Sequence, residues 1–343
     1  DIPGACVAIP NEPADSIFKD KVRAVAYPCH EVNRMIWTYM GSEDAPPPFP
    51  AFEVNTLPID QVFEPSIMVE ECNWIQGLEG DLDSSHVPFI HGRIAKDSPD
   101  PPGWGRGSWV DDRAPVLEVV PTPYGAVYSA KRVWNDNHER WHRITQWVMP
   151  FYTMIAAGSP NGCSARAWVP IDDEYHMLIN MHGRLNGTIS EEEQERAWQP
   201  YANSGGYVPE TPDPRTRYHT VANRTNDYAI NYEIQKTANM SGIPRGGNLQ
   251  DRAMIETMGV IYDRTREHLG TSDRMIIAAR QLLMSAARNL QEDGTQPAHV
   301  NDTKLYRIRS ASAILPEGAD WQEATRENRD ADAGAPVSFV PLT

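Results

Sequence analysis

Alternating apolar and polar positions predict an antiparallel sheet in the middle of the chain. Three stretches between residues 104 and 185 show this pattern and are bounded by turn-forming residues: "VLEVVPTPYGAVYSAKRVW", "RWHRITQWVMPFYTMIAAG" and "SARAWVPIDDEYHMLINMHGRL". A period of two is that of strands whose side chains point to opposite faces in turn. Pro123-Tyr124-Gly125 is placed to form a hairpin turn. We therefore predict several antiparallel strands in this region.

Helical spacing occurs on both sides of the predicted sheet. Residues 69–78 place Trp74, Ile75 and Leu78 on one stripe, which predicts a helix. A longer helix is predicted after an N-cap formed by residues 271–273, and Gly294 is expected to end it. Its apolar stripe consists of Met275, Ala279, Leu282, Leu283, Ala286 and Leu290.

The remaining segments set the expected domain organisation. Residues 1–42 are interpreted as short strands, and the proline-rich stretch of residues 42–52 as a boundary. Residues 186–250 are expected to be loops and short helices, and the polar tail from Glu317 to lie on the surface. The fold class is therefore α+β: residues 1–45 form a small all-β fragment, and residues 46–343 form an antiparallel sheet flanked by helices.

Composition narrows the classes of partner and location. The 343 residues carry a net charge of −16, which disfavours binding to nucleic acid or to an anionic membrane surface. No apolar run is long enough to span a bilayer, and no charged-then-apolar leader is present at the start, so a cytoplasmic protein is expected. The four cysteines form no metal-binding or disulfide pattern and are expected to be reduced.

Two closely spaced histidines are the first candidate for a chemical site. His86 and His91 are five residues apart, which in a straight helix separates them by about 140°. Pro88 lies between them and is expected to bend the chain so that both rings reach one point. Asp83 is close enough to contact the same turn. The chain has ten histidines, so two ordinary structural histidines at this spacing remain an open alternative.

The residues around this pair resemble a known catalytic signature. In "ECNWIQGLEGDLDSSHVPFIH", an Asn-Trp pair, an acidic residue and Asp-x-x-His-x-x-x-x-His follow the pattern of Rieske non-heme iron oxygenases. The "DSSHVPFIH" version is most similar to the phthalate dioxygenase branch. A second stretch, residues 226–273, resembles the C-terminal region of that branch. Its Gln-Asp-x-Ala-Met-x-Glu segment carries the third iron ligand in the family, which corresponds here to Asp251.

The resemblance implies a mononuclear Fe(II) held by His86, His91 and Asp251, the two-histidine, one-carboxylate set of non-heme iron oxygenases. Asp227, Asp263 and Asp273 remain alternatives for the third ligand. The family also implies a helix-grip catalytic domain of the START/Bet v 1-like type and a homotrimer or hexamer. Electrons cross its subunit interface, and the bridging carboxylate corresponds to Asp83.

The first residues resemble the end of a second domain of the same family. Residues 1–41, with "GACVAIPNEP" and "AYPCHEVNRMIWTYMG", are similar to the segment after the second pair of cluster ligands in a Rieske domain. The [2Fe–2S] cluster ligands are therefore expected upstream of Asp1, as Cys-x-His and Cys-x-x-His. A flavin and iron–sulfur reductase is the expected electron donor.

The resemblance also suggests O₂ and an aromatic carboxylate, such as a phthalate or benzoate, as substrates. A buried carboxylate needs a cation, and Arg106, Arg132 and Arg143 lie in or beside the predicted sheet. Arg143 is the first choice because Trp141 and Trp147 alternate with it on one strand. Alternatives are an O-demethylating monooxygenase, a redox-inactive binding protein and, less favoured, a zinc hydrolase, for which an obvious general base is lacking.

Overall fold

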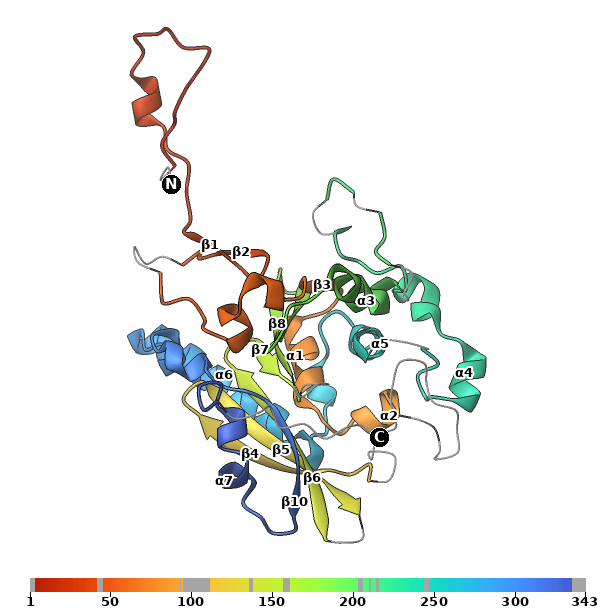
Figure 1. The fold of residues 1–343 in the computed structure, drawn as a ribbon. Coiled ribbons are helices and arrows are strands. Elements are labelled where there is room, and N and C mark those ends of the chain that lie inside the picture. The colour runs from red at the N-terminus through yellow and green to blue at the C-terminus, as the bar shows by residue number, and fades with distance from the viewer. Residues whose placement is uncertain are drawn as a thin grey trace.

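The computed structural model describes residues 4–41, 46–92, 94, 112–135, 138–156, 161–202, 206–209, 211–213, 216–243 and 247–334. An antiparallel sheet of eight strands lies at the centre of the described chain, in the order β3-β9-β8-β7-β6-β5-β4, with β10 also paired to β6 (Figure 1). The strands are β3 (Ser66–Glu70), β4 (Val116–Thr122), β5 (Gly125–Asn135), β6 (Glu139–Val148), β7 (Tyr152–Met154), β8 (Gly162–Pro170), β9 (His176–Arg184) and β10 (Ala311–Pro316).

The alternating pattern therefore predicted the sheet correctly. Strands β4 and β5 form a hairpin in which Thr122 pairs with Gly125, so Pro123 and Tyr124 make a two-residue loop, as predicted. Gly125 has a φ of +149°, which a residue with a side chain rarely adopts. The long β5–β6 pairing then places the side chains of both strands on common faces.

Two helices cover one face of the sheet, as Figure 1 shows. Helix α1 (Trp74–Leu82) contributes Leu78 and Leu82, and helix α6 (Arg274–Asp293) contributes Met275 and Ala279. They pack against a core that includes Met68, Ala126, Tyr128, Ala130, Trp147, Trp168 and Leu178. Fully burying one large apolar side chain stabilises the fold by about 1.5–3 kcal/mol. Gly294 ends α6 with a φ of +75°, as predicted.

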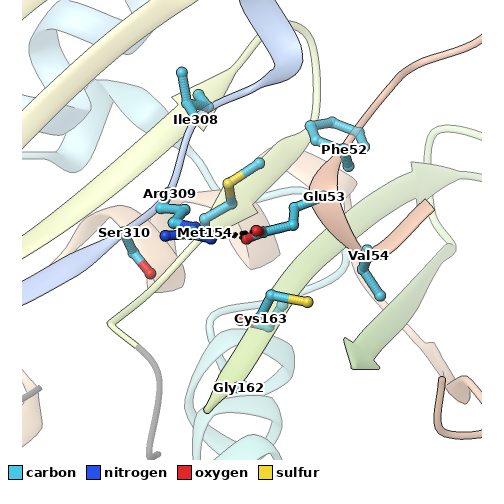
Figure 2. Close-up of a pocket in the computed structure, with 10 residues that line it drawn as sticks. Phe52, Glu53, Val54, Met154, Gly162, Cys163, Ile308, Arg309 and Ser310 are labelled. Atoms are coloured by element: carbon cyan, nitrogen blue, oxygen red, sulfur yellow. Dashed lines mark hydrogen bonds and ion pairs between the residues drawn. The ribbon is translucent and has the colours of Figure 1, made fainter. Parts of the chain in front are cut away.

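The other face of the sheet is covered by the segment before β3 and the segment before β10. Phe52 and Val54 pack there with Met154 and Tyr306. A buried ion pair between Glu53 and Arg309 joins the two covering segments, and Figure 2 shows it beside Cys163 and Met154. The cavity around this pair has a volume of about 20 Å³, room for roughly one water molecule. This cavity is therefore part of the packing and too small for a substrate.

The remaining helices lie between β9 and α6 in the chain or close to its end. They are α3 (Glu191–Ala202), α4 (Tyr232–Thr237), α5 (Gly247–Thr257) and α7 (Trp321–Ala324), and the one-turn helix α2 (Val87–Ile90) follows α1. Between residues 317 and 334 the polar tail lies mostly on the surface, as expected, but two of its residues, Trp321 and Thr325, are buried. Trp321 of α7 is buried, and its indole N–H donates to Glu118 on β4. Trp321 therefore fastens the tail to the sheet, where it packs with Val127, Ile144 and Ala311.

Two further expectations need correction. Residues 1–42 were expected to form several strands, but within residues 4–41 only β1 (Cys29–Val32) and β2 (Met35–Thr38) form a hairpin, and the preceding residues project away from the body (Figure 1). The helix predicted over residues 69–78 begins at Trp74, because Val69 belongs to β3 and Asn73 caps the helix through the Ile75 amide.

Within the described ranges, no helix combines the length and the apolar character that a membrane span requires.

The glycines of α1 give a test of how tightly this helix packs on the sheet. A Cβ at Gly77 would meet Trp168 at 2.4 Å and His176 at 2.6 Å, whereas a Cβ at Gly80 has its nearest neighbour at 3.9 Å. Gly77→Ala is therefore expected to lower the free energy of unfolding by about 1–3 kcal/mol through overpacking. The matched change Gly80→Ala should raise it by about 0.5–1 kcal/mol, because alanine favours helix.

Urea denaturation of the two variants and the parent measures this difference. If Gly77→Ala were as stable as Gly80→Ala, the close packing of α1 on β8 and β9 would be contradicted.

Candidate metal centre

The two histidines stand at the ends of the one-turn helix α2. His86 precedes its first residue and His91 follows its last, and both have helical backbone angles. Pro88 does not bend the helix, contrary to expectation. It lies in the first turn of α2, where a backbone N–H has no partner within the helix and is not needed. The two rings nevertheless face a common region, with centroids 5.2 Å apart at an angle of 78°.

Helix α5 brings the carboxylate of Asp251 to the same place. Its Oδ1 lies 2.9 Å from Nε2 of His91 and 3.4 Å from Nε2 of His86. One ligand atom from each of the three residues lies within 4.8 Å of the others, and no other group of this kind occurs among the described residues. The rival carboxylates are used elsewhere: Asp263 accepts from the Thr265 amide, and Asp273 from the Gly270 amide. The third rival, Asp227, does not belong to the group.

The second nitrogen of each ring is engaged by a partner. Nδ1 of His86 lies 3.1 Å from Oδ2 of Asp83, which also accepts from the His86 amide, while Oδ1 accepts from the Ser85 amide. Nδ1 of His91 lies 2.8 Å from Oε1 of Gln250. Both Nε2 atoms are thus left facing Asp251. This is the arrangement in which histidine binds a metal, with the far nitrogen held by an acceptor.

Electrostatics at the site favour a charged carboxylate. Burial would raise the pKa of Asp251, but the adjacent imidazoles of His91 and His86 outweigh it and hold this pKa below its ordinary value. In the same way burial opposes the charged form of His91, yet the attraction of Asp251 raises its pKa. Burial would likewise raise the pKa of Asp83, but hydrogen bonds from His86 and from two backbone amides lower this pKa below its ordinary value.

The donor set fits a divalent first-row metal such as Fe(II). Ligand atoms that lie about 2.1 Å from one ion, with angles of about 90° between their bonds to it, are about 3 Å from one another. The distances from Oδ1 of Asp251 to the two Nε2 atoms are close to this value. Two imidazoles and one carboxylate leave further coordination positions open. A cavity of about 100 Å³ adjoins all three residues and reaches Asp83, Val87 and Ile155. The site therefore has both a metal-binding set and adjacent space.

The three candidate arginines have different environments. Arg143 on β6 lines the cavity, and no hydrogen bond or ion pair joins it to another residue in the described ranges. Arg132 on β5 does not line it: its side chain is 1% exposed and donates to the Ser84 carbonyl at 2.6 Å. Burial lowers the pKa of Arg132 to about 10. Arg132 therefore supports the turn before His86, and Arg106 lies outside the described residues.

A second arginine at the cavity was not anticipated from the sequence. Arg166 on β8 pairs with Asp81 and donates to Asn180 and Asn248. All of its nitrogens are thus engaged, and it supports the wall of the cavity. The sequence feature that could have identified Arg166 is its position as a charged residue between Ala165 and Ala167 in a predicted strand. Gln250 was also missed as a residue of the site, although it immediately precedes Asp251.

Known oxygenase subunits are similar to this chain over most of its length. Residues 38–338 match the family described as LigXa C-terminal domain like. The chain is 30% identical to the 3-chlorobenzoate-3,4-dioxygenase oxygenase subunit of Comamonas testosteroni, over 94% of this chain and 75% of that one. It is also 30% identical to the phthalate 4,5-dioxygenase oxygenase subunit of Pseudomonas putida, over 94% and 73%.

A third relative has a different reaction in its name. The 5,5'-dehydrodivanillate O-demethylase oxygenase subunit of Sphingobium sp. (strain NBRC 103272 / SYK-6) is 35% identical, over 90% of this chain and 63% of its own. The family match and these identities show that the chain belongs to the oxygenase subunits of the Rieske non-heme iron oxygenases, in the branch that includes phthalate dioxygenase. The resemblance seen in the sequence is thereby confirmed.

Proposed function

We propose that this chain activates O₂ at a mononuclear Fe(II) held by His86, His91 and Asp251, and hydroxylates an aromatic carboxylate such as a phthalate or benzoate, most simply by cis-dihydroxylation. The observation that supports this most is the convergence of two Nε2 atoms and a carboxylate oxygen on a cavity that is also lined by Arg143, a cation with no ion pair among the described residues. The named reactions of the two dioxygenase relatives support the substrate class.

Each group of the cavity has a distinct part in this proposal. Iron bound there supplies the redox chemistry that activates O₂. Asp251 and the two imidazoles hold the ion, and Arg143 binds the substrate carboxylate and so orients the ring. Val87 and Ile155 give the cavity an apolar wall against which an arene can lie. The cavity therefore provides both an anchor for the acid and a place for the ring.

Electron delivery completes the proposal. Asp83 contacts His86 through its carboxylate and is the bridging group between this site and a [2Fe–2S] cluster of a neighbouring subunit in a trimer or hexamer. In this proposal a flavin and iron–sulfur reductase supplies the electrons to that cluster. The pairing of Asp83 with His86 supports the route, since a hydrogen bond links the carboxylate directly to the ligand ring.

O-demethylation is the second candidate, and the demethylase relative favours it. The two reactions differ in the atom attacked, which is a ring carbon in one case and a methyl group in the other. Product analysis of the full-length subunit with its reductase on benzoate, phthalate and methoxybenzoates separates them. Dihydrodiols support dihydroxylation, formaldehyde supports demethylation, and turnover of none of these acids would contradict the proposed substrate class.

The first prediction concerns the metal. His86→Ala, His91→Ala and Asp251→Ala are each expected to abolish stoichiometric binding of Fe(II), because two remaining ligands hold the ion weakly. Iron content after anaerobic loading and desalting measures this. His219→Ala is the matched control, since His219 is similarly accessible and pairs with Glu71 instead. Full occupancy in His86→Ala would contradict the assignment.

The second prediction concerns Asp83. Asp83→Asn keeps the shape of the side chain and removes its charge, so bound iron should be retained while product formation falls by about 10- to 100-fold, as for other partners of metal ligands. Iron content and product yield in a single turnover of the pre-reduced protein measure the two effects. A normal single-turnover rate would show that Asp83 does not serve as the bridge.

The third prediction concerns the substrate cation. A charge-assisted bond to a desolvated carboxylate contributes about 1.5–3 kcal/mol, so Arg143→Met should raise the Kd for benzoate or phthalate about 10- to 150-fold. Arg132→Met is the control: the Ser84 carbonyl loses its donor, which should lower stability and leave affinity intact. Calorimetric titration and thermal melting separate the two effects. Unchanged affinity in Arg143→Met would place the cation elsewhere or mean that the substrate is not an acid.

A further inference from the structure

Gln250, the partner of the proposed metal ligand His91, has an orientation that is fixed from both ends of its side-chain amide. Its side-chain nitrogen donates to Oγ of Ser241 at 2.8 Å and to the Ile243 carbonyl at 3.1 Å. Its oxygen faces Nδ1 of His91 at 2.8 Å. The side chain is 2% exposed, so water cannot substitute for these partners. Both N–H bonds and the oxygen of the amide are therefore used.

The opposite orientation of this amide is excluded by its partners. If the amide were flipped, its oxygen would face the Ile243 carbonyl, and two acceptors would be in contact in a buried place. The segment that sets this orientation is itself held rigidly. Asn239 donates to the Ile243 carbonyl and accepts from both the Ser241 hydroxyl and the Gly242 amide. The oxygen of Gln250 must therefore point at His91.

An oxygen can only accept, so His91 has to carry its hydrogen on Nδ1. We propose that Gln250 is a positioning residue that holds the His91 ring with hydrogen on Nδ1, so that the bare Nε2 faces the metal beside Asp251. This inference rests on the proposed function in one respect, namely that His91 binds a metal. The family match does not extend to a role for Gln250, and the geometry alone supports it.

The chemistry of the two ring partners differs, and this defines what Gln250 contributes. Asp83 places a negative charge against His86, whereas Gln250 places a neutral amide against His91. Two carboxylates, Asp83 and Asp251, already contact the rings of His86 and His91. A neutral acceptor orients the second ring without adding a third buried negative charge, which would be costly in the absence of the ion. Orientation rather than charge is therefore the contribution of Gln250.

Two substitutions separate the oxygen of Gln250 from its nitrogen. Gln250→Leu removes both, whereas Gln250→Glu keeps an acceptor toward His91 and loses the donors to Ser241 and Ile243. The affinity of the full chain for Co²⁺, a spectroscopic substitute for Fe(II), is measured by visible absorption under anaerobic conditions. We expect Gln250→Leu to weaken binding about 10- to 100-fold, and Gln250→Glu to weaken it less than about tenfold.

Gln194→Leu is the matched structural control. Gln194 also bridges two backbone groups, the Val62 carbonyl and the Glu64 amide, and it belongs to α3 rather than to the site. This variant should melt earlier than the parent and bind Co²⁺ with unchanged affinity. Equal losses of affinity in Gln250→Leu and Gln250→Glu would overturn the proposal, because the residue would then act only by holding residues 239–243. Unchanged affinity in Gln250→Leu would overturn it as well.

A second measurement, made on the parent protein, covers the case in which Gln250→Leu does not fold. In the parent labelled with ¹⁵N-histidine and loaded with Zn²⁺, imidazole NMR should show His91 protonated at Nδ1 and bound through Nε2, with its signal identified by the shift in Gln250→Glu. Hydrogen on Nε2 would overturn the role of Gln250. A parent that binds neither Co²⁺ nor Zn²⁺ would instead contradict the metal site itself, which distinguishes the two failures.

Discussion

The site depends on a fixed separation between α1 and α5, because the two histidines follow α1 while the carboxylate lies on α5. Gln76 of α1 donates to the carbonyls of Ile255 and Gly259, and its oxygen accepts from the Tyr262 amide. Glu256 of α5 accepts from the Glu71 amide just before α1. These bonds are buried or partly buried, so an unpaired donor or acceptor among them would destabilise the fold. They set the positions from which His86, His91 and Asp251 can meet.

The two arginines that line the cavity, Arg166 and Arg143, differ in how completely their charges are paired. Arg166 has all of its nitrogens engaged by Asp81, Asn180 and Asn248, so its charge is neutralised within the wall. Arg143 lies on the same cavity without such a partner among the described residues. A partly buried cation that lacks an anion is costly in the free protein, and an acidic ligand removes that cost. The difference between these two arginines therefore carries the argument for an acidic substrate.

Local patterns predicted the sheet and the long helix α6, because strand alternation and an apolar stripe are properties of short stretches. The start of α1 was misplaced because Val69 satisfies a helical stripe equally well, and only pairing with β9 assigns it to a strand. Spacing alone could not choose Asp251 among four aspartates, since the choice depends on where α5 packs. Spacing in the sequence also could not show that Arg132 and Arg143 have different environments. Their strands pair side by side, and the difference is that Ser84 meets only Arg132.

Helix α5 supplies more to the site than one ligand. Asp251 faces the histidines, and the preceding residue, Gln250, holds the ring of His91, so one helix provides both a ligand and the partner of another ligand. His86, by contrast, takes its partner from its own turn, through Asp83. Displacement of α5 would therefore remove Asp251 and release His91 together, while His86 would keep its orientation. The hydrogen bonds between α1 and α5 thus couple the positions of Asp251 and His91, two of the three proposed metal ligands.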